Sequence, residues 1–304
     1  MRALIHDPAA PHGVRLGDTD EPTPGPGQAL IQVKATSLNF GEVAFLADHR
    51  KPGEVAGWDA AGVVLAGAED GSGPPPGTRV VTFGWGGGWA QRRAVDTGEL
   101  AVLPDPVDDV SAAALPVAGV TALRAVRRLG PVVGRRVLVT GASGGVGRYA
   151  VQLAARAGAQ VVASVGRPER GEGLAELGAA EVTADLDQVA RCFGVIDNVG
   201  GALLTKAYEL LEPGGLALSI GMASLAPTTI NFERARLNNP GARVEAFVAG
   251  SGLGADLAYL AGLLSTGGLD AQVGWRGGWE RADEAIDALR GRRVLGKAVL
   301  EVPA

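Results

Sequence analysis

The sequence predicts an α/β protein in which a β-rich first part is followed by a doubly wound parallel sheet. Two observations predict this. Short apolar runs separated by strong turn signals fill the first hundred residues, and from residue 136 onward strand-like and helix-like segments alternate. Such alternation is typical of a parallel sheet with helices on both faces. At 304 residues the chain is long enough for one large domain or two ordinary ones.

The β-rich part is predicted from the turn signals between its apolar runs. The separators EPTPGPG, GSGPPPG and GWGGG are rich in residues that end strands. Many short strands of this kind are typical of a barrel-like or irregular β domain. The expected strands are 2–5, 29–35, 60–66, 79–83 and 89–95.

The second part begins with helix formers over 111–129, which indicate one or two helices. The tail after residue 250 predicts two helices, 253–264 and 280–289, and a last strand, 298–302. Between them we expect strands 136–140, 160–165, 181–183, 195–199, 216–220 and 243–248, with helices from 145 to about 157 and over 203–211.

Composition excludes several classes of protein. The net charge of −5 disfavours nucleic acid and anionic membranes as partners. The lone Cys192 can form neither an internal disulfide nor a cysteine-rich zinc site. The first residues lack the apolar core of a signal peptide, and the longest uncharged stretch, 214–232, contains Pro227 and several glycines. We therefore expect a cytoplasmic protein that acts on a small molecule.

The strongest motif is VLVTGASGGVGRYAVQLA, residues 137–154. An apolar strand leads into a glycine turn, and an amphipathic helix starts there. Three positions match the dinucleotide fingerprint, with alanine at the first. Free N–H groups at the helix start would bind a diphosphate. The predicted contacts are Ala142, Ser143, Gly144, Gly145, Val146 and Gly147.

The next strand predicts which nucleotide is bound. An NAD site usually carries Asp or Glu about twenty residues after the fingerprint, at this strand's end. Here ASVGRPER (163–170) supplies Ser164, Arg167 and Arg170 and no carboxylate at the strand end. A cation favours a 2′-phosphate, so we predict NADPH, with Arg167 ahead of Arg170. The alternative is that both arginines are solvated loop charges.

Two later loops follow predicted strands, where ligands of open parallel sheets collect. They contain Asn198 and Gly221, which we expect near the cofactor. For each residue taken singly, an ordinary turn is an equal alternative.

Taken together, six segments resemble the medium-chain dehydrogenases/reductases of the quinone oxidoreductase branch, over nearly the whole chain. The resemblance implies a GroES-like catalytic domain (1–117 with 251–304) and a Rossmann NADP-binding domain (118–250), with substrate between them and a homo-oligomer, most simply a dimer. The segments are PGPGQALIQVKATSLNF (24–40), GWDAAGVV (57–64), ALPVAGVTAL (114–123), VTGASGGVG (139–147), VIDNVGG (195–201) and GGLALSIG (214–221).

The resemblance also bears on metals. Zinc-dependent relatives place ligands where this chain has Asn39, Trp58 and Val117, none of which ligates zinc. The lobe for structural zinc is shortened to FGWGGGWAQ (83–91). The histidines His6, His12 and His49 are scattered, and we expect them on the surface or in loops. We therefore predict no metal.

Without a metal, reduction of a conjugated C=C bond or a quinone is favoured over alcohol oxidation. We predict that Asn39 donates a hydrogen bond to the substrate carbonyl, with a loop-capping asparagine as the alternative. We expect Glu42 to hold its loop, Asp59 to order backbone, and Phe45, Trp58 and Trp85 to line an apolar pocket. Two other functions stay open, namely an enoyl-thioester or carbonyl reductase of a biosynthetic pathway and a catalytically silent nucleotide-binding protein.

Overall fold

The computed structural model describes residues 1–303, which divide into two units. Unit 1 comprises Met1–Val120 with Gly250–Ala304, and unit 2 comprises Thr121–Ala249. The sequence analysis places these boundaries at 117/118 and 250/251. The first boundary falls within helix α4 (Pro116–Leu129). Among the described residues, no helix is both long and apolar enough to cross a membrane.

Unit 1 is built around a seven-stranded sheet, in which six strands follow the order β14-β15-β3-β4-β5-β7 and β6 pairs with β3. The chain's last strands join its early ones, because β15 pairs antiparallel with β3. The return of the tail to the first part, which the resemblance implies, is therefore observed. The strands are β1 (Arg2–His6), β2 (Val14–Asp18), β3 (Gln28–Leu38), β4 (Asp59–Ala66), β5 (Arg79–Phe83), β6 (Arg92–Asp96), β7 (Leu100–Val102), β14 (Val273–Gly278) and β15 (Lys297–Glu301).

One core of unit 1, which includes Trp89 and Trp279, draws residues from strands β1, β3, β4 and β15 and from helices α1, α2 and α9. Alternation of buried and partly buried residues along β3 shows one face turned toward this core. The helices are α1 (Phe40–Ala44), α2 (Leu46–His49), α3 (Asp109–Ala113), α8 (Gly254–Ser265) and α9 (Ala282–Arg290).

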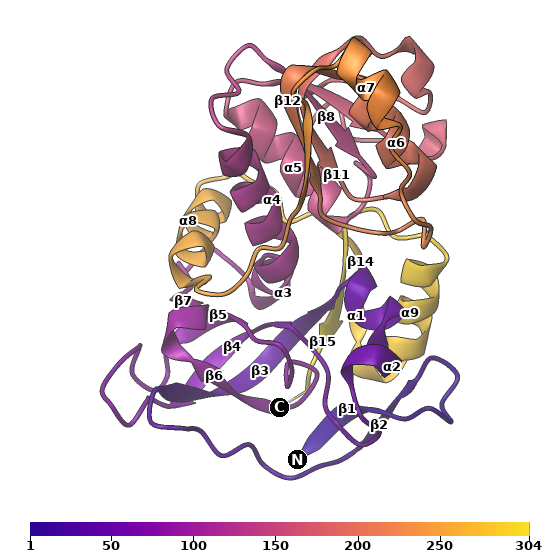
Figure 1. The fold of residues 1–304 in the computed structure, drawn as a ribbon. Helices are drawn as coiled ribbons and strands as arrows, with labels where there is room; N and C mark the ends of the chain where they lie inside the picture. Colours follow the sequence, from indigo (N-terminus) through magenta and orange to yellow (C-terminus); the bar gives the residue numbers. More distant parts are fainter. Residues whose placement is uncertain (304) are drawn as a thin grey trace. The chain divides into compact units, whose positions relative to one another are not determined.

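Unit 2 is a six-stranded sheet in the order β10-β9-β8-β11-β12-β13, and its registered strand pairs are all parallel. Helices α5 and α6 lie on opposite faces of this sheet (Figure 1). The predicted doubly wound fold is confirmed. The strands are β8 (Arg136–Thr140), β9 (Gln160–Ser164), β10 (Ala179–Thr183), β11 (Cys192–Asp197), β12 (Leu211–Ser219) and β13 (Arg243–Ala246), and the helices are α5 (Gly145–Arg156), α6 (Gly201–Glu209) and α7 (Phe232–Asn238).

The structure corrects several sequence expectations. The strand expected over 89–95 begins only at Arg92, and β2, β7, β14 and α7 were not predicted. His6 is buried in β1, where its Nδ1 lies 2.8 Å from the carbonyl oxygen of Gly13. It is therefore a core histidine and not the surface or loop residue expected. The hydrogen bond to this carbonyl lets an imidazole occupy a buried strand.

Candidate active site

In unit 2 the carboxyl ends of β8 and β11 lie where the strand order reverses. From β8 the chain moves outward to β9 and β10, then crosses back to form β11 on the other side of β8. Ligands of doubly wound sheets bind outside the carboxyl ends at such a point. The glycine turn follows β8 and Asn198 follows β11, so the fold brings two of the predicted cofactor segments to one place.

The glycine turn is shaped by close backbone contacts. A Cβ on Gly147 would lie 2.3 Å from the carbonyl oxygen of Gly141, so only glycine lets α5 pack this near to β8. Gly141 itself has φ +59°. At Gly144 the nearest atom to an added Cβ is the same carbonyl oxygen, at 3.4 Å, which leaves room above the turn.

The first amides of α5 have no acceptor within the helix. With the positive end of the helix dipole, they form a binding place for a diphosphate. The residues present therefore fit a dinucleotide.

Asn198 and Gly221 meet beside this turn. The side-chain amide of Asn198 donates to the carbonyl oxygen of Thr140 at 2.8 Å. A Cβ on Gly221 would lie 2.7 Å from the carbonyl oxygen of Asn198. The buried Asp197 orders the loop by accepting bonds from Thr140 Oγ1 (2.5 Å) and the Gly200 amide (2.8 Å), and burial raises the pKa of Asp197.

The loop after β9 carries the two arginines. Arg170 Nε donates to Ser143 Oγ at 2.9 Å, which joins this loop directly to the glycine turn. Arg167 is exposed and precedes a short 3-10 helix, Pro168–Gly171. Ser164 is buried, and its carbonyl oxygen accepts from the Ala142 amide at 3.0 Å. The structure thus brings Arg170 to the turn and leaves Arg167 at the loop surface.

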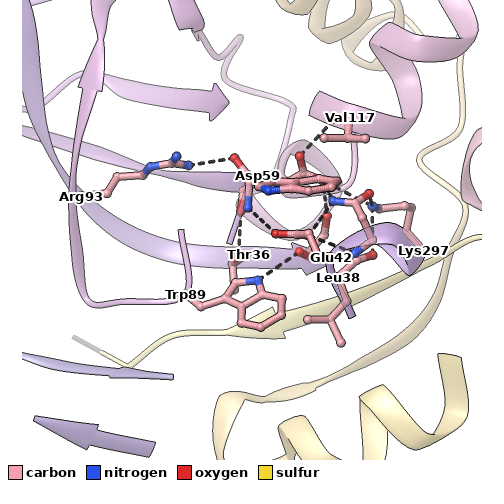
Figure 2. Close-up of polar contacts among 11 residues, drawn as sticks. Thr36, Leu38, Glu42, Asp59, Trp89, Arg93, Val117 and Lys297 are labelled. Atoms are coloured by element: carbon pink, nitrogen blue, oxygen red, sulfur yellow. Dashed lines mark hydrogen bonds and ion pairs between the residues drawn. The ribbon is translucent and has the colours of Figure 1, made fainter. Parts of the chain in front are cut away.

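Unit 1 contains a buried cluster of polar side chains, which we call the carboxylate cluster: Asn39, Glu42, Asp59, Arg93 and Lys297 (Figure 2). Strand pairing assembles it. In β4 Asp59 faces Ser37 of β3, and in β15 Ala298 faces Leu38, so the start of β15 lies beside the end of β3. Asn39 follows β3 directly and is the N-cap of α1.

The amide group of Asn39 is fully engaged within this cluster. Its Nδ2 donates to Glu42 Oε2 and to Asp59 Oδ2, each at 2.9 Å. Its Oδ1 accepts from Lys297 Nζ at 2.6 Å. An amide nitrogen has two hydrogens. Both hydrogens are therefore used, and a donor role of Asn39 toward substrate would require it to release a carboxylate; that role stays a prediction.

The charges of the cluster are almost fully removed from water. Lys297 Nζ lies 3.3 Å from Asp59 Oδ2, and the two side chains are 3% and 0% exposed. Burial and the neighbouring Asp59 carboxylate raise the pKa of Glu42 to about 8, against the opposing effects of Asn39 and Lys297. Burial likewise lowers the pKa of Arg93 to about 10. Arg93 donates only to neutral oxygens, at Trp58, Thr82 and Gly86.

Glu42 and Asp59 also order the backbone, as the sequence analysis expected. Glu42 Oε1 accepts from the Trp58 amide at 2.6 Å, and Asp59 Oδ1 from the Val117 amide at 3.0 Å. Lys297 and Arg93 were missed. For Lys297, the available signal was a single charge directly before the apolar run AVLEV. For Arg93, it was a charge at a position of a predicted strand that alternation turns inward.

The carboxylate cluster does not fit a zinc ion. Of the three positions where zinc-dependent relatives carry ligands, Trp58 and Val117 contribute backbone atoms and Asn39 an engaged amide. The carboxylate oxygens accept hydrogen bonds from protein donors, and an ammonium group lies among them. Within residues 1–303 no group of three or more His, Cys, Asp or Glu residues could hold a metal.

Aromatic side chains lie next to the cluster. The rings of Trp58 and Trp85 meet edge to face with centroids 5.6 Å apart, and Phe83 meets Trp85 at 5.1 Å. Trp85 is 55% exposed, an unusual position for so large an apolar ring. Phe45, expected in the same pocket, pairs instead with His49.

Comparison with known proteins identifies the family. Residues 25–105 match the alcohol dehydrogenase GroES-like domain, and residues 145–278 match the zinc-binding dehydrogenase domain. An acrylyl-CoA reductase of Ruegeria pomeroyi is 32% identical over 252 residues, which cover 70% of this chain and 76% of that protein. This chain belongs to the medium-chain dehydrogenase/reductase superfamily.

Other medium-chain dehydrogenases/reductases extend the match. Erythronolide synthase of Saccharopolyspora erythraea is 32% identical over 295 residues, 91% of this chain but only 8% of that much longer protein. A quinone oxidoreductase of Pseudomonas syringae superposes with a TM-score of 0.88 at 25% identity, covering 99% of this chain and 100% of that one. The chain is thus an oxidoreductase of the branch that includes quinone oxidoreductases and enoyl reductases.

Proposed function

We propose that this protein is an NADPH-dependent oxidoreductase that transfers hydride to a quinone or an α,β-unsaturated carbonyl compound without a metal ion. One observation carries the proposal: the glycine turn at the strand-order reversal is tied through Ser143 to Arg170, beside a strand end that lacks a carboxylate. The quinone oxidoreductase and the acrylyl-CoA reductase among its relatives support the same chemistry.

Unit 2 would hold the nucleotide. The first amides of α5, from Gly145 onward, would bind the diphosphate beside Ala142, Ser143 and Gly144, and Arg167 and Arg170 would bind the 2′-phosphate. Ser164, Asn198 and Gly221 surround the rest. When bound, NADPH supplies a hydride, and the substrate takes one proton from water or a side chain to complete the reduction.

Unit 1 would contact the substrate. Because Asn39 is held by Glu42, Asp59 and Lys297, the carboxylate cluster fixes this segment rigidly. A preorganised wall positions a substrate without reorganisation at the moment of reaction. The aromatic rings of Trp58 and Trp85 offer a flat apolar surface suited to a conjugated compound.

The test is a panel of quinones, alkenals and enoyl thioesters, each assayed by the oxidation of NADPH and NADH. We expect turnover of a quinone or an alkenal, with catalytic efficiency at least about tenfold higher for NADPH than for NADH. Comparable efficiency with both nucleotides would contradict the NADPH assignment. Stoichiometric zinc by elemental analysis would contradict the metal-free assignment.

Enoyl-thioester reduction is the second candidate, favoured by the acrylyl-CoA reductase relative. It predicts turnover of an enoyl thioester with little activity on quinones or alkenals. If NADPH quenches the protein's fluorescence but no compound of the panel is reduced, the protein binds nucleotide without catalysis. We further propose that the protein is a cytoplasmic homodimer. Light scattering of the purified protein measures its mass and tests the dimer.

A further inference from the structure

The loop that carries the predicted phosphate-binding arginines is held by two hydrogen bonds, one to the glycine turn and one to helix α5. Arg170, in the loop, donates to Ser143 in the glycine turn at 2.9 Å. In the reverse direction Arg148, in the first turn of α5, donates through Nη2 to the carbonyl oxygen of Glu172. The segment from Gly166 to Gly173 is thus joined both to the turn and to the helix that follows it.

Arg148 is placed to hold this loop. It is only 7% exposed, although the same helix has partly exposed positions at which an arginine side chain would stay in water. Its guanidinium lies against Gly173, where an added Cβ would be 3.4 Å from Nη2 and 3.6 Å from Nη1. Gly173 has φ +75°, a conformation that glycine adopts freely.

An apolar side chain would fill this space at lower desolvation cost, since burying a cation is unfavourable unless its hydrogen bonds are made. What arginine adds is a rigid, planar donor that reaches a backbone carbonyl 24 residues along the chain. The carbonyl belongs to Glu172, two residues after Arg170. The position of Arg170 therefore depends on Arg148 as well as on Ser143.

We propose that Arg148 is a positioning residue for nucleotide selection, which holds the 166–173 loop so that Arg167 and Arg170 meet the 2′-phosphate of NADPH. The inference rests on the proposed function, because it assumes that these two arginines bind that phosphate. Arg148 itself is buried beneath the loop and need not touch the nucleotide.

The experiment compares Arg148→Leu and Arg148→Lys in the full-length protein, with Arg156→Leu as matched control. Arg156 lies in the last turn of the same helix and is exposed, so its substitution removes the same charge without touching the loop. Dissociation constants for NADPH and NADH are measured by fluorescence titration, with kcat, KM and thermal melting for each variant.

We expect Arg148→Leu to weaken NADPH binding about tenfold, the loss of roughly one charge-assisted hydrogen bond, while NADH binding and kcat change less than about twofold. Arg148→Lys recovers part of the loss, and Arg156→Leu leaves both constants unchanged. Equal weakening of both nucleotides, or unchanged NADPH binding in Arg148→Leu, would overturn the inference.

The double variant Arg167→Ala/Arg170→Ala separates this inference from the proposed function. If the wild type prefers NADPH and the double variant loses that preference while Arg148→Leu keeps it, only the role of Arg148 fails. If the wild type shows no preference, the NADPH assignment itself fails, and the inference with it.

Discussion

In unit 1 most polar side chains of the carboxylate cluster bind one another, whereas in unit 2 the first amides of α5 have no acceptor within their helix. Asn39 gives both amide hydrogens to Glu42 and Asp59 and accepts from Lys297. At Gly144 the space above the backbone is open. The first region is held by its own side chains and the second keeps open space above its backbone, so substitutions in them should differ in kind.

The largest effect is expected from Lys297→Met, which breaks the buried ion pair with Asp59. Removing one partner leaves an uncompensated buried carboxylate, which lowers the free energy of unfolding by about 3–5 kcal/mol. Chemical denaturation measures the loss. Asp59→Asn combined with Lys297→Met should recover part of it, and Lys51→Met, an exposed lysine, serves as control. A melting temperature within one degree or so of wild type for Lys297→Met would show that the cluster contributes little rigidity.

Gly147→Ala comes next, because its Cβ would overlap the Gly141 carbonyl oxygen and force α5 away from β8. Such overpacking lowers the free energy of unfolding by about 1–3 kcal/mol, and NADPH binding is lost with it. Gly144→Ala is the matched variant. Its Cβ meets no atom nearer than 3.4 Å, so the protein should keep its melting temperature and bind NADPH more weakly. If both variants are equally stable and bind equally well, the turn is not a diphosphate site.

The single variants Arg167→Ala and Arg170→Ala test the predicted 2′-phosphate site in unit 2. Each should raise the KM for NADPH about tenfold and leave the KM for NADH unchanged, since NADH has no 2′-phosphate to lose. The sequence places Arg167 first, and the contact of Arg170 with Ser143 gives Arg170 the better fixed position. Glu169→Gln, between them in the same exposed loop, is the control. A matching rise for both nucleotides would point to loop folding instead of phosphate recognition.

A further expected effect concerns the pH dependence of stability. Because the pKa of Glu42 is raised to about 8 from an ordinary value near 4.5, the folded state holds a proton that the unfolded state has released between these values. Stability from this group is present in full below about pH 4.5 and falls as the pH rises toward 8. Between pH 5 and pH 8 the melting temperature should therefore fall more steeply for wild type than for Glu42→Gln. Parallel curves would contradict a raised pKa.

The glycine turn could be predicted from the sequence because its geometry depends on the backbone. The glycines in VTGASGGVG have a local explanation, because the helix must start close to the strand and no side chain fits between them. The strand before and the helix after have strong periodicity, and β8 was predicted residue for residue. The boundaries of short strands such as β6 were less well marked, since its neighbours Trp89 and Ala90 are equally buried outside the strand.

The carboxylate cluster could not be predicted in the same way. Its members come from four separate stretches of chain, and only the pairing of β15 with β3 brings Lys297 to Asn39. In the sequence Asn39 looked like a donor with hydrogens to spare. Which partners a buried side chain finds depends on strand order, and no local pattern states it.

The division of unit 1 into two distant segments has a consequence for synthesis. Unit 2 is continuous, from Thr121 to Ala249, and can fold as soon as it leaves the ribosome. The first 120 residues emerge earlier but lack β14 and β15, so their central sheet still has an open edge. Glu42 and Asp59 lack the neighbouring ammonium group until Lys297 is translated. The part of unit 1 that is made first is therefore completed only when β15 is made, after the whole of unit 2.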